Sequence, residues 1–113
     1  MDERVIEVLQ KAKEKVAEGW CQGALARWPD GRVLATGPID AGRLDTAAAV
    51  CVSGAIQNYV GTTDNHLEAL AFMFLQLAIR DGAACWNDAP GRTQVEVLDA
   101  FDAAIRLAKD TPA

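Results

Sequence analysis

The stretch from Asp64 to Arg80 constrains the fold more than any other part of this sequence, because it is apolar on nearly every side of a helical projection. Its apolar side chains are Leu67, Leu70, Ala71, Phe72, Met73, Phe74, Leu75, Leu77, Ala78 and Ile79. Thr63 or Asp64 can cap the start of such a helix, and Gly82 is expected to stop it. A helix with so little polar surface is usually central in a fold. Otherwise it shares one face with a second copy of the protein.

Two further helices are expected before this one. The first spans Asp2–Glu18 with a single apolar stripe, and Gly19 is expected to end it in a left-handed conformation. The second is rich in alanine, with Asp45 or Thr46 as its cap and an end near residue 60, where Gly61 follows. Its small side chains would allow another helix to approach closely.

The last helix has the clearest start signal in the chain. Thr93-Gln94-Val95-Glu96 fits a capping box, in which Thr93 caps the helix and Glu96 reaches back to the cap. The inward positions are expected to be Val95, Leu98, Phe101, Ile105 and Ala108. Asp102 and Arg106 are expected to pair on the outer face, because residues four apart are neighbours on a helix.

Residues 20–36 resemble a β-hairpin. Trp28-Pro29-Asp30-Gly31 has the residue order of a type I turn closed by a glycine bulge. The flanking segments, Gln22–Arg27 and Arg32–Thr36, are long enough for two strands, although alanines in the first segment are poor strand formers.

Two segments are expected to be loops: residues 37–44, which carry Arg43, and residues 83–92, which have no periodicity. The fold class is therefore α+β, mostly α, with about four helices and a small β-hairpin (residues ~20–36) after the first helix. The length of 113 residues fits a single domain spanning residues 1–113.

The charge balance narrows the range of partners. Eleven basic and sixteen acidic side chains leave a formal charge of −5. Because binding to nucleic acid or to an anionic membrane requires a basic surface, we expect neither. No stretch is apolar enough for a membrane span. Met1-Asp2-Glu3-Arg4 leads directly into the first helix without a signal-peptide pattern. Three widely spaced cysteines do not form a disulfide framework, so we expect a cytoplasmic location.

Two short segments place a tryptophan beside a cysteine outside any helical repeat. They are Gly19–Ala24 and Cys85–Thr93. If they meet in space, they could bind a small anionic ligand such as a nucleotide, with the guanidinium of Arg92 close to the free N–H groups that open the last helix. The candidate ligand-binding residues are Trp20, Gln22, Trp86, Asn87, Asp88, Arg92 and Thr93. The alternative is structural: these side chains form turns, fill the core and pair with one another.

Metal binding and cysteine catalysis are two further hypotheses, and the sequence disfavours both. The chain has as many cysteine and histidine side chains as a structural zinc site has ligands, namely Cys21, Cys51, His66 and Cys85. Their spacing contains no C-x-x-C pair, so we expect no metal and no cofactor. A nucleophilic cysteine would need the single histidine, His66, as its base. Established enzyme signatures are missing, and no catalytic residue is assigned.

Three elements of the chain resemble a family of small uncharacterised bacterial and phage proteins, known as a domain of unknown function. The family shares a G-W-[CT]-Q-G-A element, a C-x-x-G-A-[IL] element and a W-N-D-x-x-x-R-T-x-x-E-V-L element. They stand here in the same order at residues 19–24, 51–56 and 86–98. The resemblance implies a bacterial or phage origin and one domain, but no activity. Because the family allows Thr where this chain has Cys21, a role that needs a thiol there is disfavoured.

The sequence thus favours a non-enzymatic, cytoplasmic binding protein, such as an adaptor or a phage-type inhibitor, that acts on a protein partner or associates as a homodimer. The first alternative is a small-molecule or nucleotide sensor or sequestering protein that uses the Trp20 and Trp86–Arg92 segments. The second alternative is a cysteine-dependent enzyme.

Overall fold

A computed structural model describes residues 2–37 and 39–112, which form five helices and three short strands. In chain order these are α1 (Glu3–Glu18), β1 (Ala26–Arg27), β2 (Val33–Ala35), β3 (Ala49–Val50), α2 (Val52–Val60), α3 (Asn65–Ile79), α4 (Ala83–Asn87) and α5 (Gln94–Asp110). The predicted class, α+β and mostly helical with a small sheet after the first helix, is confirmed. Of the predicted loop over residues 37–44, Pro38 lies outside the described residues.

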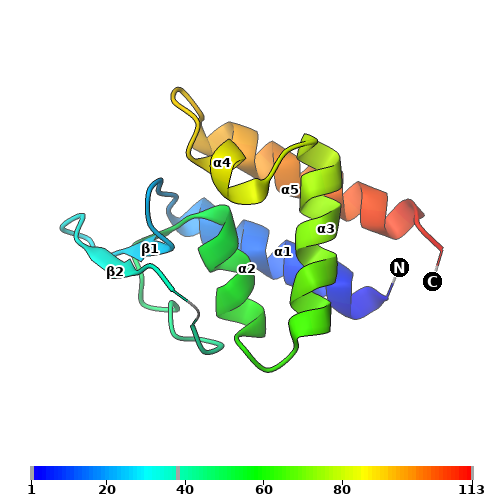
Figure 1. The fold of residues 1–113 in the computed structure, drawn as a ribbon, viewed down its shortest axis with the longest axis horizontal. Coiled ribbons are helices and arrows are strands. Elements are labelled where there is room, and N and C mark those ends of the chain that lie inside the picture. The colour runs from blue at the N-terminus through cyan, green and yellow to red at the C-terminus, as the bar shows by residue number, and fades with distance from the viewer. Residues whose placement is uncertain (1, 38, 113) are drawn as a thin grey trace.

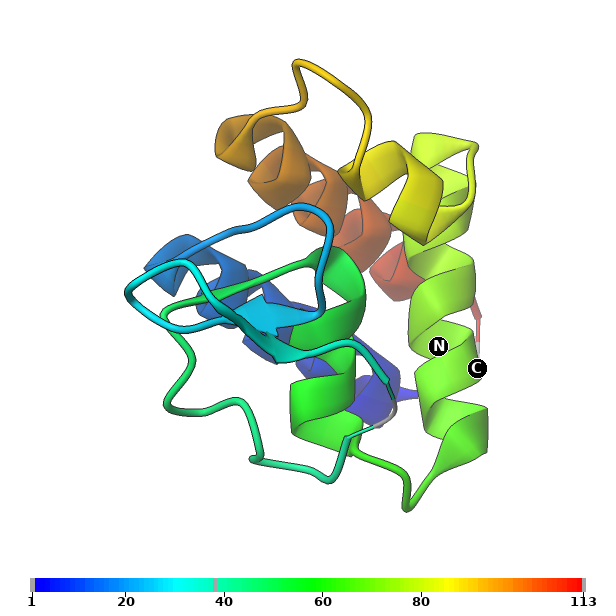
Figure 2. The same cartoon turned by 60° about the vertical axis from the view of Figure 1, so that its left-hand side comes forward.

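The helices form two crossed layers. α1 and α5 run side by side in opposite directions, so that both termini lie at one end of the molecule, while α2 and α3 form a helical hairpin across them (Figures 1 and 2). The largest fully buried side chains come from both layers and from the segment before α2: Phe74, Phe101, Leu9, Leu44, Ile56 and Leu75. Each such side chain contributes about 1.5–3 kcal/mol by leaving water, so the core accounts for the association of the layers.

The predicted hairpin is present with shorter strands. β1 pairs with β2 antiparallel, the register shifts between Ala26 and Arg27, and Gly31 in the turn has a φ of +88°. A third strand, β3, which the sequence did not predict, pairs with the other edge of β1. The sheet lies beside α2 at one end of the molecule (Figure 1).

The prediction for the start of the second helix is wrong. α2 begins at Val52 and is capped by Cys51, whose sulfur accepts a hydrogen bond from the Gly54 N–H at 3.3 Å. Residues 45–50 instead form turns and β3. The buried Lys15 ammonium holds them by donating to the carbonyls of Asp45 at 2.9 Å and Ala47 at 3.4 Å. Tertiary bonds therefore override the helix propensity of the alanines.

Two helix ends also differ from expectation, and one further helix is present. Gly19 does end α1, but with a φ of 174°, which is extended rather than left-handed. α3 ends at Ile79 with Arg80 in the left-handed conformation, and Gly82 instead caps α4. That short helix, α4, occupies the first half of the segment predicted to be a loop at residues 83–92. Asp64 caps α3 and Gly61 follows α2, as predicted.

The capping box at the start of α5 is confirmed, since Glu96 N donates to Thr93 Oγ1 and Thr93 N donates to Glu96 Oε1. Two other expectations for this helix are wrong. Val95 is 65% exposed, and Val97 takes the inward position because the buried stripe is set by packing on α1 and α3. Asp102 accepts a hydrogen bond from Lys13 of α1 at 2.6 Å rather than pairing with Arg106.

Candidate functional site

The two tryptophan-containing segments meet in space, although more than 60 residues separate them along the chain. They join at the first turn of α2. We call this region the junction: residues 19–24, residues 51–54 and residues 86–93. The ligand-binding hypothesis required the two tryptophan-containing segments to meet in this way.

Asn87 lies at the centre of the junction with no exposed surface. Its Oδ1 accepts hydrogen bonds from Trp20 Nε1 at 2.8 Å and from Val52 N at 3.2 Å. Its Nδ2 donates to the Cys21 carbonyl at 3.1 Å and to Asp88 Oδ1 at 2.9 Å. Because each polar atom of this amide has protein partners, Asn87 ties α4 to both α2 and the segment after α1.

The neighbouring polar residues close the same contact. Gln22 Nε2 donates to the carbonyls of Asn87 at 2.9 Å and Ala89 at 3.0 Å. Asp88 Oδ1 accepts a hydrogen bond from Gly23 N at 3.0 Å. These bonds hold residues 22–23 against the end of α4.

Arg92 is also engaged within the protein. Its guanidinium lies 4.1 Å from the centroid of the Trp86 ring, Nε donates to the Trp86 carbonyl, and Nη1 donates to Glu96 Oε2. Its side chain is only 20% exposed. An anion at the start of α5 would therefore compete with Glu96, whose carboxylate already accepts from Thr93 N and Thr93 Oγ1. These hydrogen bonds lower the pKa of Glu96.

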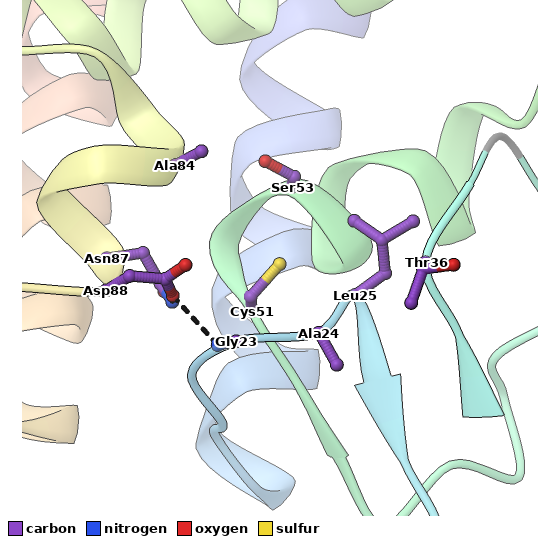
Figure 3. Close-up of a pocket in the computed structure, with 9 residues that line it drawn as sticks. All are labelled: Gly23, Ala24, Leu25, Thr36, Cys51, Ser53, Ala84, Asn87 and Asp88. Atoms are coloured by element: carbon purple, nitrogen blue, oxygen red, sulfur yellow. Dashed lines mark hydrogen bonds between the residues drawn. The ribbon is translucent and has the colours of Figure 1, made fainter. Parts of the chain in front are cut away.

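A cavity of about 180 Å³ opens beside the junction. Figure 3 shows its lining residues, which come from the segment before β1, the end of β2, the first turn of α2, and α4: Gly23, Ala24, Leu25, Thr36, Cys51, Ser53, Ala84, Asn87 and Asp88. Of the predicted ligand residues, Asn87 and Asp88 line it, while Trp20, Gln22, Trp86, Arg92 and Thr93 do not. Sequence reasoning missed Ser53, Leu25 and Thr36, since no local pattern marks residues that only the tertiary fold brings together.

The thiols near the junction are poor nucleophiles. Burial, with a smaller effect of the neighbouring Cys51, raises the pKa of Cys21 to about 11, and burial also raises the pKa of Cys51. Both are therefore protonated at neutral pH, whereas the thiolate is the reactive form. Cys85 is exposed on α4, which lies beside the C-terminal end of α3 (Figure 1). His66 is in the first turn of α3, so the two residues lie at opposite ends of this helix. Within the described ranges, no group of three or more His, Cys, Asp or Glu side chains could hold a metal ion.

A different surface stands out on α3. Although this helix is apolar nearly all round, its fully buried residues are only Ala71, Phe74 and Leu75. Met73 is 39% exposed and Leu77 is 55% exposed, and Ala69 is exposed on the same side. α3 lies at the edge of the helical layers (Figure 2). We call this side, with Ala69, Met73 and Leu77, the outer face of α3.

Comparison with protein families identifies the family of this chain. A model of the DUF6197 family, described as a family of unknown function, matches residues 1–107. The chain belongs to this family. The match confirms the resemblance to a domain of unknown function, and it covers both the junction and the outer face of α3. No curated protein and no solved structure matches this DUF6197 chain.

Over the part of the DUF6197 chain that the structure describes, no helix has both the length and the apolar character needed to cross a membrane.

Proposed function

We propose that this protein is a non-enzymatic, cytoplasmic interaction domain of bacterial or phage origin, an adaptor or inhibitor that binds a protein partner through the outer face of α3. The observation that carries the proposal is the exposure of Met73 and Leu77 on a helix with two apolar sides. α3 packs on α1, α2, α4 and α5, and among the residues that the structure describes nothing fully covers Met73 and Leu77 on its outer face. Apolar positions that are exposed together on one surface typically mark an interaction site.

The character of the junction supports a binding role over a catalytic one. Its amide, guanidinium and indole groups are used in bonds within the chain. These bonds hold α2, α4 and α5 in place. Because α3 packs against all three helices, they also fix the position of α3. The buried, protonated thiols supply no nucleophile.

A photocrosslinking experiment tests the proposal. Benzoylphenylalanine is placed at Met73 or, as a matched control, at the exposed Val95 of α5, and the protein is expressed in its source organism. We expect an adduct from position 73 that Leu77→Glu abolishes and that position 95 does not give, with the bound protein identified by mass spectrometry. If position 73 gives no specific adduct, the proposed function is wrong.

The cavity beside the junction supports a second candidate, a sensor or sequestering protein for a small ligand. Its volume of about 180 Å³ is below the roughly 300–1,000 Å³ of typical ligand pockets. A ligand of a few heavy atoms would fit it, and a nucleotide would not. Thermal unfolding with inorganic phosphate tests this candidate, since a ligand at a hundred times its Kd adds about 2.7 kcal/mol of stability. A shift that Ser53→Leu removes by filling the cavity would support it, and the absence of a shift would exclude phosphate.

A further inference from the structure

The outer face of α3 has a regular arrangement of large and small side chains. Ala69, Met73 and Leu77 follow one another at intervals of four residues, so they form one stripe within an arc of about 80°. Ala69 is small, Leu77 is large, and Met73 lies midway between them. A methionine side chain is flexible and adapts to irregular contacts.

This stripe is complementary to itself. If two copies of α3 cross in opposite directions about a two-fold axis at Met73, Leu77 of each copy faces Ala69 of the other. The two methionines meet at the axis. A large side chain then fills the space left by a small one on both sides of the axis, which is the condition for close helix packing.

The lack of charge on the exposed positions of α3 also favours contact between two copies of this helix. Its exposed positions are Asn65, His66, Ala69, Met73, Gln76 and Leu77, and none is an acid or a lysine or arginine. The exposed positions of α1 and α5, by contrast, include Glu14, Glu18 and Asp99 among other charged residues. For a chain with a formal charge of −5, this makes the outer face of α3 a surface on which two copies can approach with little repulsion.

Antiparallel packing of two α3 helices would also set the two helix dipoles in opposite directions.

We propose that the partner of this face is a second copy of the chain, bound through antiparallel α3 helices with Met73 on the two-fold axis and Leu77 against Ala69 of the second copy. This inference rests on the proposed function and names its partner. In the photocrosslinking experiment, an adduct of the protein with itself supports both. An adduct with another protein supports the proposed function and overturns the homodimer, so the two failures are distinguishable.

Exchange of the large and small residues gives the sharpest test. Light scattering of the purified protein should give twice the monomer mass of 12.1 kDa. Ala69→Leu and Leu77→Ala should each weaken the dimer about tenfold or more, the first by a clash and the second by loss of contact. The double variant restores a large residue opposite a small one, and we expect a Kd close to that of the parent. Both positions are exposed in the monomer, and circular dichroism checks that each variant folds.

Disulfide trapping tests the axis directly. In a Cys85→Ser background, Met73→Cys should form a covalent dimer by exchange with oxidised glutathione, while Val95→Cys should not. The buried, protonated Cys21 and Cys51 do not compete. A protein that stays at 12.1 kDa up to about 1 mM, a dimer that the double variant fails to restore, or equal trapping at positions 73 and 95 would overturn the inference.

Discussion

Asn87 is the residue on which the polar contacts of the junction converge. Its replacement by alanine would leave the indole N–H of Trp20, the N–H of Val52 and the Cys21 carbonyl without their partner in a buried region. Each unsatisfied group costs about 1–3 kcal/mol, and partial relaxation lowers the sum. We expect Asn87→Ala to lower the free energy of unfolding by about 3 kcal/mol, measured by urea unfolding with circular dichroism.

The control for this prediction is Asn65→Ala, at an exposed position on α3. It should change stability by less than about 0.5 kcal/mol, as for most surface substitutions. A loss no greater in Asn87→Ala than in Asn65→Ala would show that the amide does not hold the junction together.

The buried thiol of Cys21 predicts how the stability of the protein depends on pH. Its ordinary pKa is 9.0, and in the folded protein the pKa is about 11, because burial disfavours the thiolate. Between these pH values the unfolded chain binds fewer protons than the folded chain, so stability falls as pH rises. At about 1.4 kcal/mol per pKa unit the full shift is worth about 2.8 kcal/mol, and about 2 kcal/mol of this is lost between pH 9 and pH 11.

Urea unfolding near pH 8 and near pH 11, under reducing conditions, measures this loss. Cys21→Ser should remove that part of the pH dependence, while Cys85→Ser, at an exposed thiol, should retain all of it. Equal pH dependence in the two variants would contradict the prediction.

At the residue scale, the sequence predicts those contacts that are local. Thr93 and Glu96 are three residues apart, so their capping box follows from the sequence pattern alone. Trp20 and Asn87 form a hydrogen bond although they are 67 residues apart in the sequence. The composition of the two segments marked them as unusual but did not show that these two side chains pair. The structural alternative predicted that Arg92 pairs within the protein, but its contacts with the Trp86 ring and with Glu96 were not predicted.

At the scale of elements, close approach explains why two motif positions are glycine. A Cβ at Gly54 would lie 2.1 Å from the Leu25 carbonyl oxygen, and a Cβ at Gly19 would lie 1.9 Å from that of Ala48. These glycines therefore allow α2 to pack on the segment before β1, and the end of α1 to pack on the segment before β3. Neither lies in the left-handed region of φ, since the φ of Gly19, 174°, is extended, so the reason is space and not backbone conformation.

We accordingly expect Gly54→Ala to destabilise the protein by about 2–4 kcal/mol, despite the higher helix propensity of alanine. The backbone of Leu25 would have to move, and with it the pairing of β1. Gly82→Ala is the matched control, because a Cβ there meets nothing within 4 Å. Thermal unfolding of the two variants checks the difference, and equal midpoints would show that the junction accommodates the added methyl group.

The misplaced start of α2 shows why elements could be predicted only in part. Asp45 and Thr46 are good capping residues before a run of alanines, and local propensity alone predicts a helix there. In the fold, Asn58 Nδ2 donates to Asp45 Oδ1, and Ala49 pairs with Arg27 in the sheet. Helix α4 was missed for a related reason, since five residues are too few to show helical periodicity.

At the scale of the whole molecule, self-association links stability to concentration. If the native state is a dimer and unfolding yields two separate chains, dilution favours unfolding by mass action. A tenfold dilution changes the free energy by about 1.4 kcal/mol, and the unfolding entropy of two such chains converts this to about 3 °C in Tm. A strictly monomeric native state has no such dependence.

Calorimetry over a hundredfold range of concentration should therefore show a Tm that rises by about 6 °C in the parent protein. Leu77→Glu buries two carboxylates at the proposed interface, so its Tm should become independent of concentration, while Val95→Glu should keep the rise. A constant Tm in the parent would mean that the apolar outer face of α3 is left exposed in the folded monomer. Its partner would then have to be a different protein, because the same face would still need cover to remove its apolar side chains from water.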